Sequence, residues 1–250
     1  MMLWFLVPAH GRYDLTAVCL RQLRRTCDAL TEGGIEASAV VIADDENLDT
    51  AREFGFGTIE RENAPLGRKW NDGFELACDP ECNPRPVDYV VPMGSDDWLD
   101  PNLLLTADLP AADEILCFRQ AAFVAEDGKR LARLTIAYAG GIGIRVIPRA
   151  LLEQARYRPA DEDRKRAIDT STLNGIARAN RARPTLRYHE LHSLQIVDWK
   201  TNGAQLNSFD ACMKFEHGGV SEDPFGQLAA VYPADALAEM QALYEQRVAA

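Results

Sequence analysis

Short apolar runs that end in polar residues alternate with helical patterns along the first part of the chain. The runs at 3–7 and 39–43 and the segment at 87–92 are each followed within three residues by polar or charged side chains. Apolar runs of this length, separated by helices, are typical of parallel strands buried on both faces. Open parallel sheets bind ligands at the carboxyl ends of their strands, so we expect three polar strand ends to line one crevice.

The segments between the runs have helical periodicity. One apolar stripe follows Asp14 and ends before the glycine pair at 33–34. Its members, and those of two later stripes, are Leu15, Val18, Cys19, Leu23, Cys27 and Leu30; Trp70, Phe74 and Ala77; and Leu237, Met240, Tyr244 and Val248. The order predicted for residues 1–100 is β-α-β-α-β-α-β. This order predicts an α/β fold with a mostly parallel central sheet flanked by helices.

The third strand end carries two adjacent carboxylates, Asp96 and Asp97. Hard oxygen ligands suit Mg²⁺ or Mn²⁺, which proteins often hold with one or two carboxylates plus the phosphates of a substrate. Asp is also favoured at helix N-caps, so the pair has a second interpretation as a cap before Trp98 and Leu99. On this segment alone the two interpretations stand level. The polar ends of the other two strands favour a metal-bound diphosphate.

Four segments follow one another over about the first 150 residues: VPAHGR at 7–12, VIADD at 41–45, LGRKWNDG at 66–73 and GSDD at 94–97. In order and spacing they resemble the motifs of nucleotide-sugar glycosyltransferases of the GT-A fold, in particular glycosyltransferase family 2. The family patterns are V-P-x-Y-N-R, V-V-D-D, L-G-x-x-x-N-x-G and D-x-D. The chain departs from them at His10 and Gly11, where the family often has Tyr and Asn, and at Gly94, where it has the first carboxylate.

The resemblance implies a Rossmann-like GT-A fold over residues 1–250 as a single domain. Residues 1–105 would form the nucleotide-sugar-binding half, and residues 106–250 the acceptor-side half with a C-terminal helix. The implied activity is metal-dependent transfer of a sugar from a nucleoside diphosphate sugar, with a UDP-sugar favoured, to an acceptor hydroxyl with inversion. Mn²⁺ or Mg²⁺ would be the cofactor.

The resemblance also implies the residues that bind the donor. The segment from Pro8 to His10 would lie near the nucleoside, Asp45 or Asp44 would accept a hydrogen bond from the base, and Asp96 would lie near the ribose. Asp97 would carry the cation. The full donor-binding set is Pro8, Ala9, His10, Arg12, Asp44, Asp45, Arg68, Lys69, Asn71, Ser95 and Asp96.

Two segments further along match the family less closely. Residues 140–145 resemble its acceptor-side loop, and residues 168–173 its E-D-x-x-L segment, which places a general base at Asp169. The alternative role for Asp169 is capping the helix that Leu173 and Ile176 mark. Rivals for the base stand on a charged loop at 156–166, which we interpret as an exposed lid; they are Asp161, Glu162 and Asp163. A downstream histidine sometimes completes the metal site in this fold, and the candidates are His189, His192 and His217.

Composition restricts the partners. A chain of 250 residues with 47% hydrophobic content is long enough to bury a large core. No apolar run approaches the roughly 18 residues of a membrane span, and the start lacks the features of a signal peptide, so we expect a cytoplasmic protein. The net charge of -11 argues against generic nucleic-acid binding. The expected partners are a sugar nucleotide and a hydroxyl-bearing acceptor.

Two other functions stay open at this point. A nucleotidyltransferase would use the same sheet and metal, although such enzymes normally have a glycine-rich loop after the first strand, and residues 8–12 are poor in glycine. A non-catalytic module that binds sugar nucleotides is the other. The sequence identifies neither the sugar nor the acceptor, which is a glycan, lipid, protein or modified nucleobase. Oligomeric state and the stereochemical outcome are also left undetermined.

Overall fold

The first seven elements follow the order that the sequence predicts. The computed structural model describes residues 1–44, 46–135, 143–165, 168–181, 183–191, 194–200, 208–214 and 216–249. The chain begins with β1 (Met2–Pro8), α1 (Tyr13–Glu32), β2 (Glu36–Ala43), α2 (Asn47–Glu53), β3 (Gly57–Glu60), α3 (Leu66–Cys78) and β4 (Tyr89–Pro92). The β-α-β-α-β-α-β order is therefore confirmed.

Later elements are shorter. They are β5 (Asp97–Leu99), α4 (Pro101–Thr106), β6 (Glu114–Phe118), β7 (Gln120–Val124), β8 (Leu131–Thr135), β9 (Arg145–Pro148), α5 (Arg149–Gln154), α6 (Ile168–Ala179), β10 (Thr185–His189), β11 (Ile196–Trp199), α7 (Phe209–Cys212), β12 (Glu216–Ser221), α8 (Pro224–Leu228) and α9 (Ala234–Ala249). None of the helices in the described ranges combines the length and the apolar content that crossing a membrane requires.

The larger sheet has seven strands in the order β10-β6-β9-β4-β1-β2-β3. The pairs of β1 with β2, β1 with β4, β2 with β3 and β10 with β6 are parallel, and β9 is antiparallel to both its neighbours. Leu3, Phe5 and Val7 face α1, whereas Leu6 faces α3 with Val40. Because strand side chains alternate in direction, a nearly continuous apolar strand is what a sheet covered on both faces needs. The expected mostly parallel α/β sheet is present.

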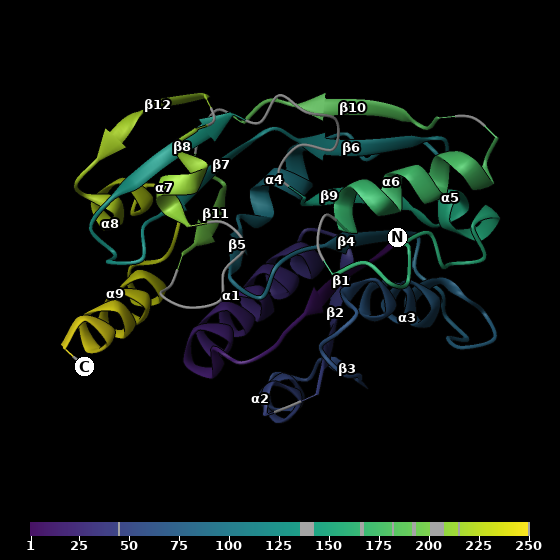
Figure 1. Cartoon of the computed structure of the whole chain (residues 1–250), viewed down its shortest axis with the longest axis horizontal. Coiled ribbons are helices and arrows are strands. Elements are labelled where there is room, and N and C mark those ends of the chain that lie inside the picture. Colours follow the sequence, from purple (N-terminus) through teal and green to yellow (C-terminus); the bar gives the residue numbers. More distant parts are fainter. Residues whose placement is uncertain are drawn as a thin grey trace.

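A second sheet, which the sequence pattern did not indicate, has five strands in the order β12-β8-β7-β11-β5. It lies on the left in Figure 1, with α8 and α9 beside it. One face packs Trp98 and Trp199 at 4.9 Å between ring centroids, and Met240 and Tyr244 of α9 join the same cluster. This packing fixes β5, and therefore Asp97, against β11.

The helix-cap interpretation of Asp96 and Asp97 is wrong. Asp97 is the first residue of strand β5, and α4 begins only at Pro101. The N-cap of α4 is Asp100, whose Oδ1 accepts a hydrogen bond from the Asn102 amide at 3.1 Å. Capping therefore explains Asp100 and does not explain the carboxylates before it.

The charged loop is clamped along its described residues, 156–165. The Gly67 amide donates to the carbonyl of Arg164 at 2.9 Å, and the Asn71 side chain exchanges two 2.9 Å hydrogen bonds with the main chain of Ala160. A Cβ at Gly67 would overlap the carbonyl of Asp161, and one at Gly175 would overlap that of Pro159. The loop is held between α3 and α6, which differs from the free lid that its charge suggested.

Replacing Gly175 with Ala is expected to lower the free energy of unfolding by about 2 kcal/mol or more, despite the better helix propensity of Ala, because the new methyl group overlaps a backbone carbonyl. Chemical denaturation measures the change. Gly218→Ala is the control, since no atom lies within 4 Å of its Cβ position. Wild-type stability in Gly175→Ala would show that the clamp is not tight.

Candidate functional site

The order of strands in the larger sheet places a switch point between β1 and β4. The chain moves from β1 outwards to β2 and β3 and then returns to β4 on the other side of β1. Ligands of open α/β sheets bind at the carboxyl ends of the strands that flank such a point. The segment 8–12 follows β1 and the segment 93–97 follows β4, so the two sequence motifs meet where the topology favours a ligand.

Arg12 joins the two segments. Its Nη1 donates to Oδ2 of Asp96 at 2.6 Å, and its Nη2 donates to Oγ of Ser95 at 3.0 Å. Burial works against the charge of Arg12, but the Asp96 carboxylate outweighs it and raises the pKa of Arg12. The guanidinium therefore stays charged and fixes the two strand ends relative to each other.

Three carboxylates gather beside this bridge. Asp97 of β5 lies directly opposite Asp198 of β11 in the antiparallel register. Asp96, Asp97 and Asp198 offer oxygen atoms that all lie within 4.8 Å of one another. Like charges directly opposite each other destabilise a strand pair, and among the described residues the two side-chain cations paired with the cluster, Arg12 and Lys200, are fewer than its three carboxylates.

The electrostatics of the cluster favour a cation. Burial, followed by the charges of Asp198 and Asp96, raises the pKa of Asp97 well above its usual value. Burial also raises the pKa of Asp198 to about 6, even though Lys200 lies 2.5 Å from its Oδ2 and works in the opposite direction. The other oxygen of Asp198, Oδ1, is buried and has no hydrogen-bond partner among the described residues. A set of hard oxygen donors with one oxygen unsatisfied fits Mn²⁺ or Mg²⁺.

Asp198 is a residue that the sequence analysis missed. The available signal was a lone carboxylate inside the apolar strand Ile196–Trp199. The histidines expected to complete the metal site lie elsewhere: His189 is on the edge strand β10, where its ring meets Phe118, and His217 is on β12, the far edge of the smaller sheet. His192 is outside the described residues. Among the described residues, the group around Asp96 and Asp97 is completed by Asp198 and includes no histidine.

The residues that follow β2 and β3 line a separate cavity, at the same edge of the sheet as the acidic cluster. A cavity of about 500 Å³ is lined by Asp44, Glu60, Arg61, Glu62, Ala64, Pro65 and Arg68. Oδ1 of Asp44 lies 3.2 Å from His10 Nδ1, and its Oδ2 accepts from the Asn63 amide at 3.0 Å. Slight burial raises the pKa of Asp44, but these two hydrogen bonds outweigh it and lower the pKa. Asp45 is outside the described residues.

Two side chains predicted to bind the donor, Lys69 and Asn71, instead form hydrogen bonds to backbone groups of the protein. Lys69 is fully buried, and its Nζ donates to the carbonyl of Ala9 at 2.8 Å and to Oδ1 of Asn63 at 3.3 Å. Both polar atoms of the Asn71 side chain bond to Ala160. Ala9 is itself buried and donates its amide to Ile42. Lys69 and Asn71 therefore shape the loop after β1 and the loop at 158–164, and Arg68, which is half exposed, faces the cavity.

Asp169 is the second residue of α6, and its side chain is 23% exposed. Nη1 of Arg145 donates to the Asp169 carbonyl at 3.2 Å, and Nη2 of Arg145 lies 3.7 Å from Asp169 Oδ2. In the register of β4 with β9, Tyr89 pairs with Pro148, so continuing it puts Arg145 opposite Pro92 at the carboxyl end of β4. Asp169 thus lies toward the sheet edge that carries the acidic cluster.

The rival bases are engaged in ion pairs on the clamped loop. Asp161 lies 3.4 Å from Arg164, Glu162 lies 2.9 Å from Arg158, and Asp163 lies 3.9 Å from Arg68. These contacts neutralise the carboxylates on the outer side of the loop.

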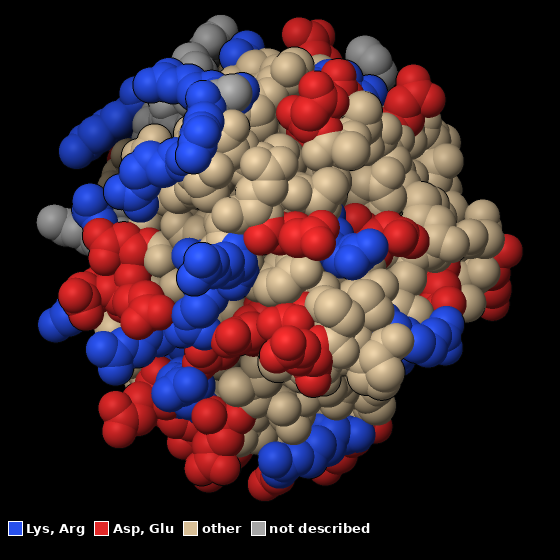
Figure 2. Space-filling model, turned by 90° about the vertical axis from the view of Figure 1, so that its right-hand side faces the viewer, with Lys and Arg blue, Asp and Glu red and all other residues tan. Residues whose placement is uncertain are grey.

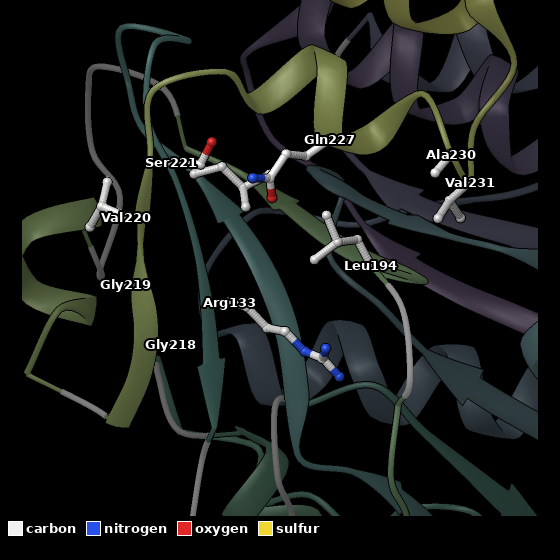
Figure 3. Close-up of a pocket in the computed structure, with 10 residues that line it drawn as sticks. Arg133, Leu194, Gly218, Gly219, Val220, Ser221, Gln227, Ala230 and Val231 are labelled. Carbon is white, nitrogen blue, oxygen red and sulfur yellow. The ribbon is translucent and has the colours of Figure 1, made fainter.

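A cavity of about 700 Å³ lies elsewhere, between the smaller sheet and α8 (Figure 3). Its lining includes Arg133 of β8. Arg133 pairs with Ala122, Ala122 with Val197, and Val197 with Trp98, so Arg133 and Trp98 lie on the same side of the sheet. Successive strand residues point to opposite faces, so Arg133 and Asp97 project from opposite sides of the sheet. The cavity does not belong to the acidic site.

The surface charge is mixed on the face formed by α3, α5 and α6. Figure 2 shows acidic and basic side chains interspersed there, with a gathering of Lys and Arg at the upper left. Arg178, Arg181 and Arg183, near the end of α6, are exposed. The described face has no continuous basic track of the kind that a phosphate backbone needs.

No known family profile matches the sequence, and no curated protein matches it. Solved structures do. Drosophila β1,4-galactosyltransferase 7, in complex with manganese, UDP-Gal and xylobiose, is 16% identical, with 76% of this chain and 65% of that chain covered and a TM-score of 0.44. Glucosyl-3-phosphoglycerate synthase from Mycobacterium tuberculosis, in complex with Mn²⁺ and UDP-glucose, is 12% identical, with coverage of 82% and 72% and a TM-score of 0.47.

A third match is a glycosyltransferase involved in the glycosylation of the major capsid of PBCV-1, at 11% identity, coverage of 82% and 95%, and a TM-score of 0.43. This chain spans 65% of the Drosophila enzyme. The case for a function therefore rests on the chain's own residues.

Proposed function

We propose that this protein is a metal-dependent glycosyltransferase that moves a sugar from a nucleoside diphosphate sugar, with uridine favoured, to an acceptor hydroxyl with inversion. The observation that carries the proposal is the cluster of Asp96, Asp97 and Asp198 at the switch point of the sheet. Its unsatisfied oxygen and raised pKa values are features of a site that is complete only with a cation.

Each part of the donor has a place along the sheet edge. Asp96, Asp97 and Asp198 would hold the cation next to the diphosphate, and the cavity bordered by Asp44 and Arg68 would take the base. When bound, the cation supplies Lewis-acid stabilisation of the leaving diphosphate, which is typically worth several kcal/mol. Arg12 keeps the two strand ends at a fixed spacing, so the donor meets a preorganised edge.

The chemical step needs a base for the acceptor hydroxyl. Asp169 fits this role because its carboxylate is partly exposed and lies toward the same sheet edge. It would take the proton as the acceptor oxygen attacks the anomeric carbon, the C–O bond to the diphosphate breaks, and the configuration inverts. General-base assistance of this kind contributes about 10² to 10⁴-fold in rate.

The product released separates this function from its rivals. Purified protein with Mn²⁺ is incubated with a panel of sugar nucleotides and, separately, with nucleoside triphosphates and sugar phosphates. A glycosyltransferase releases nucleoside diphosphate, slowly to water in the absence of an acceptor. Release of pyrophosphate would identify a nucleotidyltransferase. Donor binding without either product would favour a non-catalytic binding module.

UDP is expected to raise the melting temperature in the presence of Mn²⁺ more than ADP does, because a carboxylate at the base cavity accepts a hydrogen bond from the uracil N–H. Asp45→Ala, which removes the carboxylate that the family motif assigns to this hydrogen bond, should cost about 1 to 3 kcal/mol of UDP binding. Asp49→Ala, a surface carboxylate in α2 paired with Arg52, is the control. Equal stabilisation by ADP and UDP would exclude a preference for uridine, without bearing on the assignment of the fold.

A further inference from the structure

Arg145, the first residue of β9, carries a guanidinium that is almost fully buried, with 1% of its side chain exposed. We propose that Arg145 is a positioning residue that orients the Asp169 carboxylate for proton removal. This inference rests on the proposed function, because it assigns Asp169 the part of the base.

Arg145 contacts both the main chain and the carboxylate of Asp169. Nη1 donates to the Asp169 carbonyl at 3.2 Å, which fixes the first turn of α6 against β9. Nη2 lies 3.7 Å from Asp169 Oδ2, a separation too long for a hydrogen bond. The interaction with the carboxylate is therefore electrostatic, and it leaves the oxygens of Asp169 able to accept a proton from a substrate.

Burial makes the charge of Arg145 consequential. A guanidinium taken out of water is costly unless an opposite charge is near, and its field reaches further in the interior than at the surface. The Asp169 carboxylate, 3.7 Å from Nη2, is such a charge, so the buried guanidinium and the carboxylate hold each other in place.

The same guanidinium also reaches the chain that leads into β9. Its Nε donates to the carbonyl of Gly143 at 3.0 Å. Gly143 belongs to the stretch 140–145 that resembles an acceptor-side loop, so Arg145 links the end of that stretch to the helix of the base. Because Arg145 lies opposite the end of β4, it holds Gly143 and the start of α6 near the sheet edge where the donor is proposed to bind.

A double-mutant cycle tests the proposal, with the rate of sugar transfer, or of donor hydrolysis without acceptor, and UDP affinity measured for each variant. The variants are Arg145→Met, Arg145→Lys, Asp169→Asn and the two Arg145 variants in the Asp169→Asn background. Arg145→Met should lower kcat by about tenfold or more, while UDP affinity stays within about twofold. Arg145→Lys keeps a cation beside Asp169, so it should recover most of the lost rate.

In the Asp169→Asn background, neither Arg145 variant should lower the rate further by more than about twofold, because Arg145 acts through that carboxylate. Equal losses in both backgrounds, or wild-type turnover in Arg145→Met, would overturn the proposal and leave Arg145 a structural residue. If the Met variant does not fold, Arg145→Gln, which also removes the charge, takes its place in the same comparison of backgrounds. Failure of the proposed function is seen separately, as a wild-type protein that consumes no donor.

Discussion

Replacing Asp97 with Asn is expected to remove the Mn²⁺-dependent part of UDP binding while raising the melting temperature of the metal-free protein at pH 8. The amide keeps the shape of the side chain but not the charge that a hard cation needs, so calorimetry should show UDP affinity in Mn²⁺ falling by at least about tenfold. In EDTA, the affinity of the variant and of the wild type should agree.

The stability change follows from the direction of the pKa shifts. Burial and the charges of Asp198 and Asp96 raise the pKa of Asp97, and burial raises the pKa of Asp198 to about 6. A carboxyl whose pKa is higher in the folded state destabilises the fold as it ionises, so the cost is absent below about pH 4 and is complete, for Asp198, above about pH 6. Asp97→Asn removes one of the repelling charges. Its stabilising effect should therefore shrink as the pH falls from 8 to 4.

Asp100→Asn is the matched control for this prediction. Asn caps a helix about as well as Asp, and Asp100 is the N-cap of α4 rather than a member of the cluster. That variant should keep both the metal dependence and the pH dependence of the wild type. Unchanged UDP affinity in Asp97→Asn, with and without Mn²⁺, would remove Asp97 from the metal site.

Replacing Asp169 with Asn is expected to slow sugar transfer by about 10²-fold or more and to leave UDP affinity nearly unchanged. A base takes the acceptor proton and does not hold the donor, so the loss appears in kcat. Loss of a metal ligand would weaken donor binding as well, and loss of a helix-end contact would lower stability by about 1 kcal/mol without this loss of rate. Turnover, UDP affinity and melting temperature of the one variant separate these roles.

The neighbouring loop supplies the controls for Asp169. Asp161→Asn, Glu162→Gln and Asp163→Asn change carboxylates that pair with arginines on the clamped loop. Each should retain turnover within a few-fold of the wild type. If transfer survives in Asp169→Asn and disappears in one of these variants, the base lies on the loop and the match of residues 168–173 to the family segment is displaced.

The sequence predicted those strands and helices that leave a pattern of apolar residues within a short window of the chain. Strands β1 and β2 are buried on both faces, so their apolar runs are nearly continuous, and α1 and α9 carry stripes at helical spacing. The five-stranded sheet has no such signal. Strand β5 has three residues, and its partner β11 lies about a hundred positions later, so neither the sheet nor the pairing of Asp97 with Asp198 leaves a pattern in any short window.

The site was also predicted only where the signal is local. The positions of the motifs predicted that segments 8–12 and 94–97 lie at one edge of the sheet, because parallel strands end together, and the Arg12–Asp96 ion pair joins them. Spacing did not tell which polar side chains face a ligand. Lys69 and Asn71 stand within a donor-binding motif, yet their side chains bond to the backbone at Ala9 and Ala160. The direction in which these two side chains point depends on how segments distant in the sequence pack against them, and a local motif does not encode that packing.

Electron paramagnetic resonance of Mn²⁺ detects the proposed metal site itself, because free Mn²⁺ gives a sharp six-line signal that weakens when the ion binds to protein. With UDP present, we expect the wild type and Asp100→Asn each to remove about one Mn²⁺ per chain from that signal, and Asp198→Asn to leave most of the ion free. An undiminished signal with the wild type, or equal binding by Asp198→Asn, would contradict a metal site built from Asp96, Asp97 and Asp198.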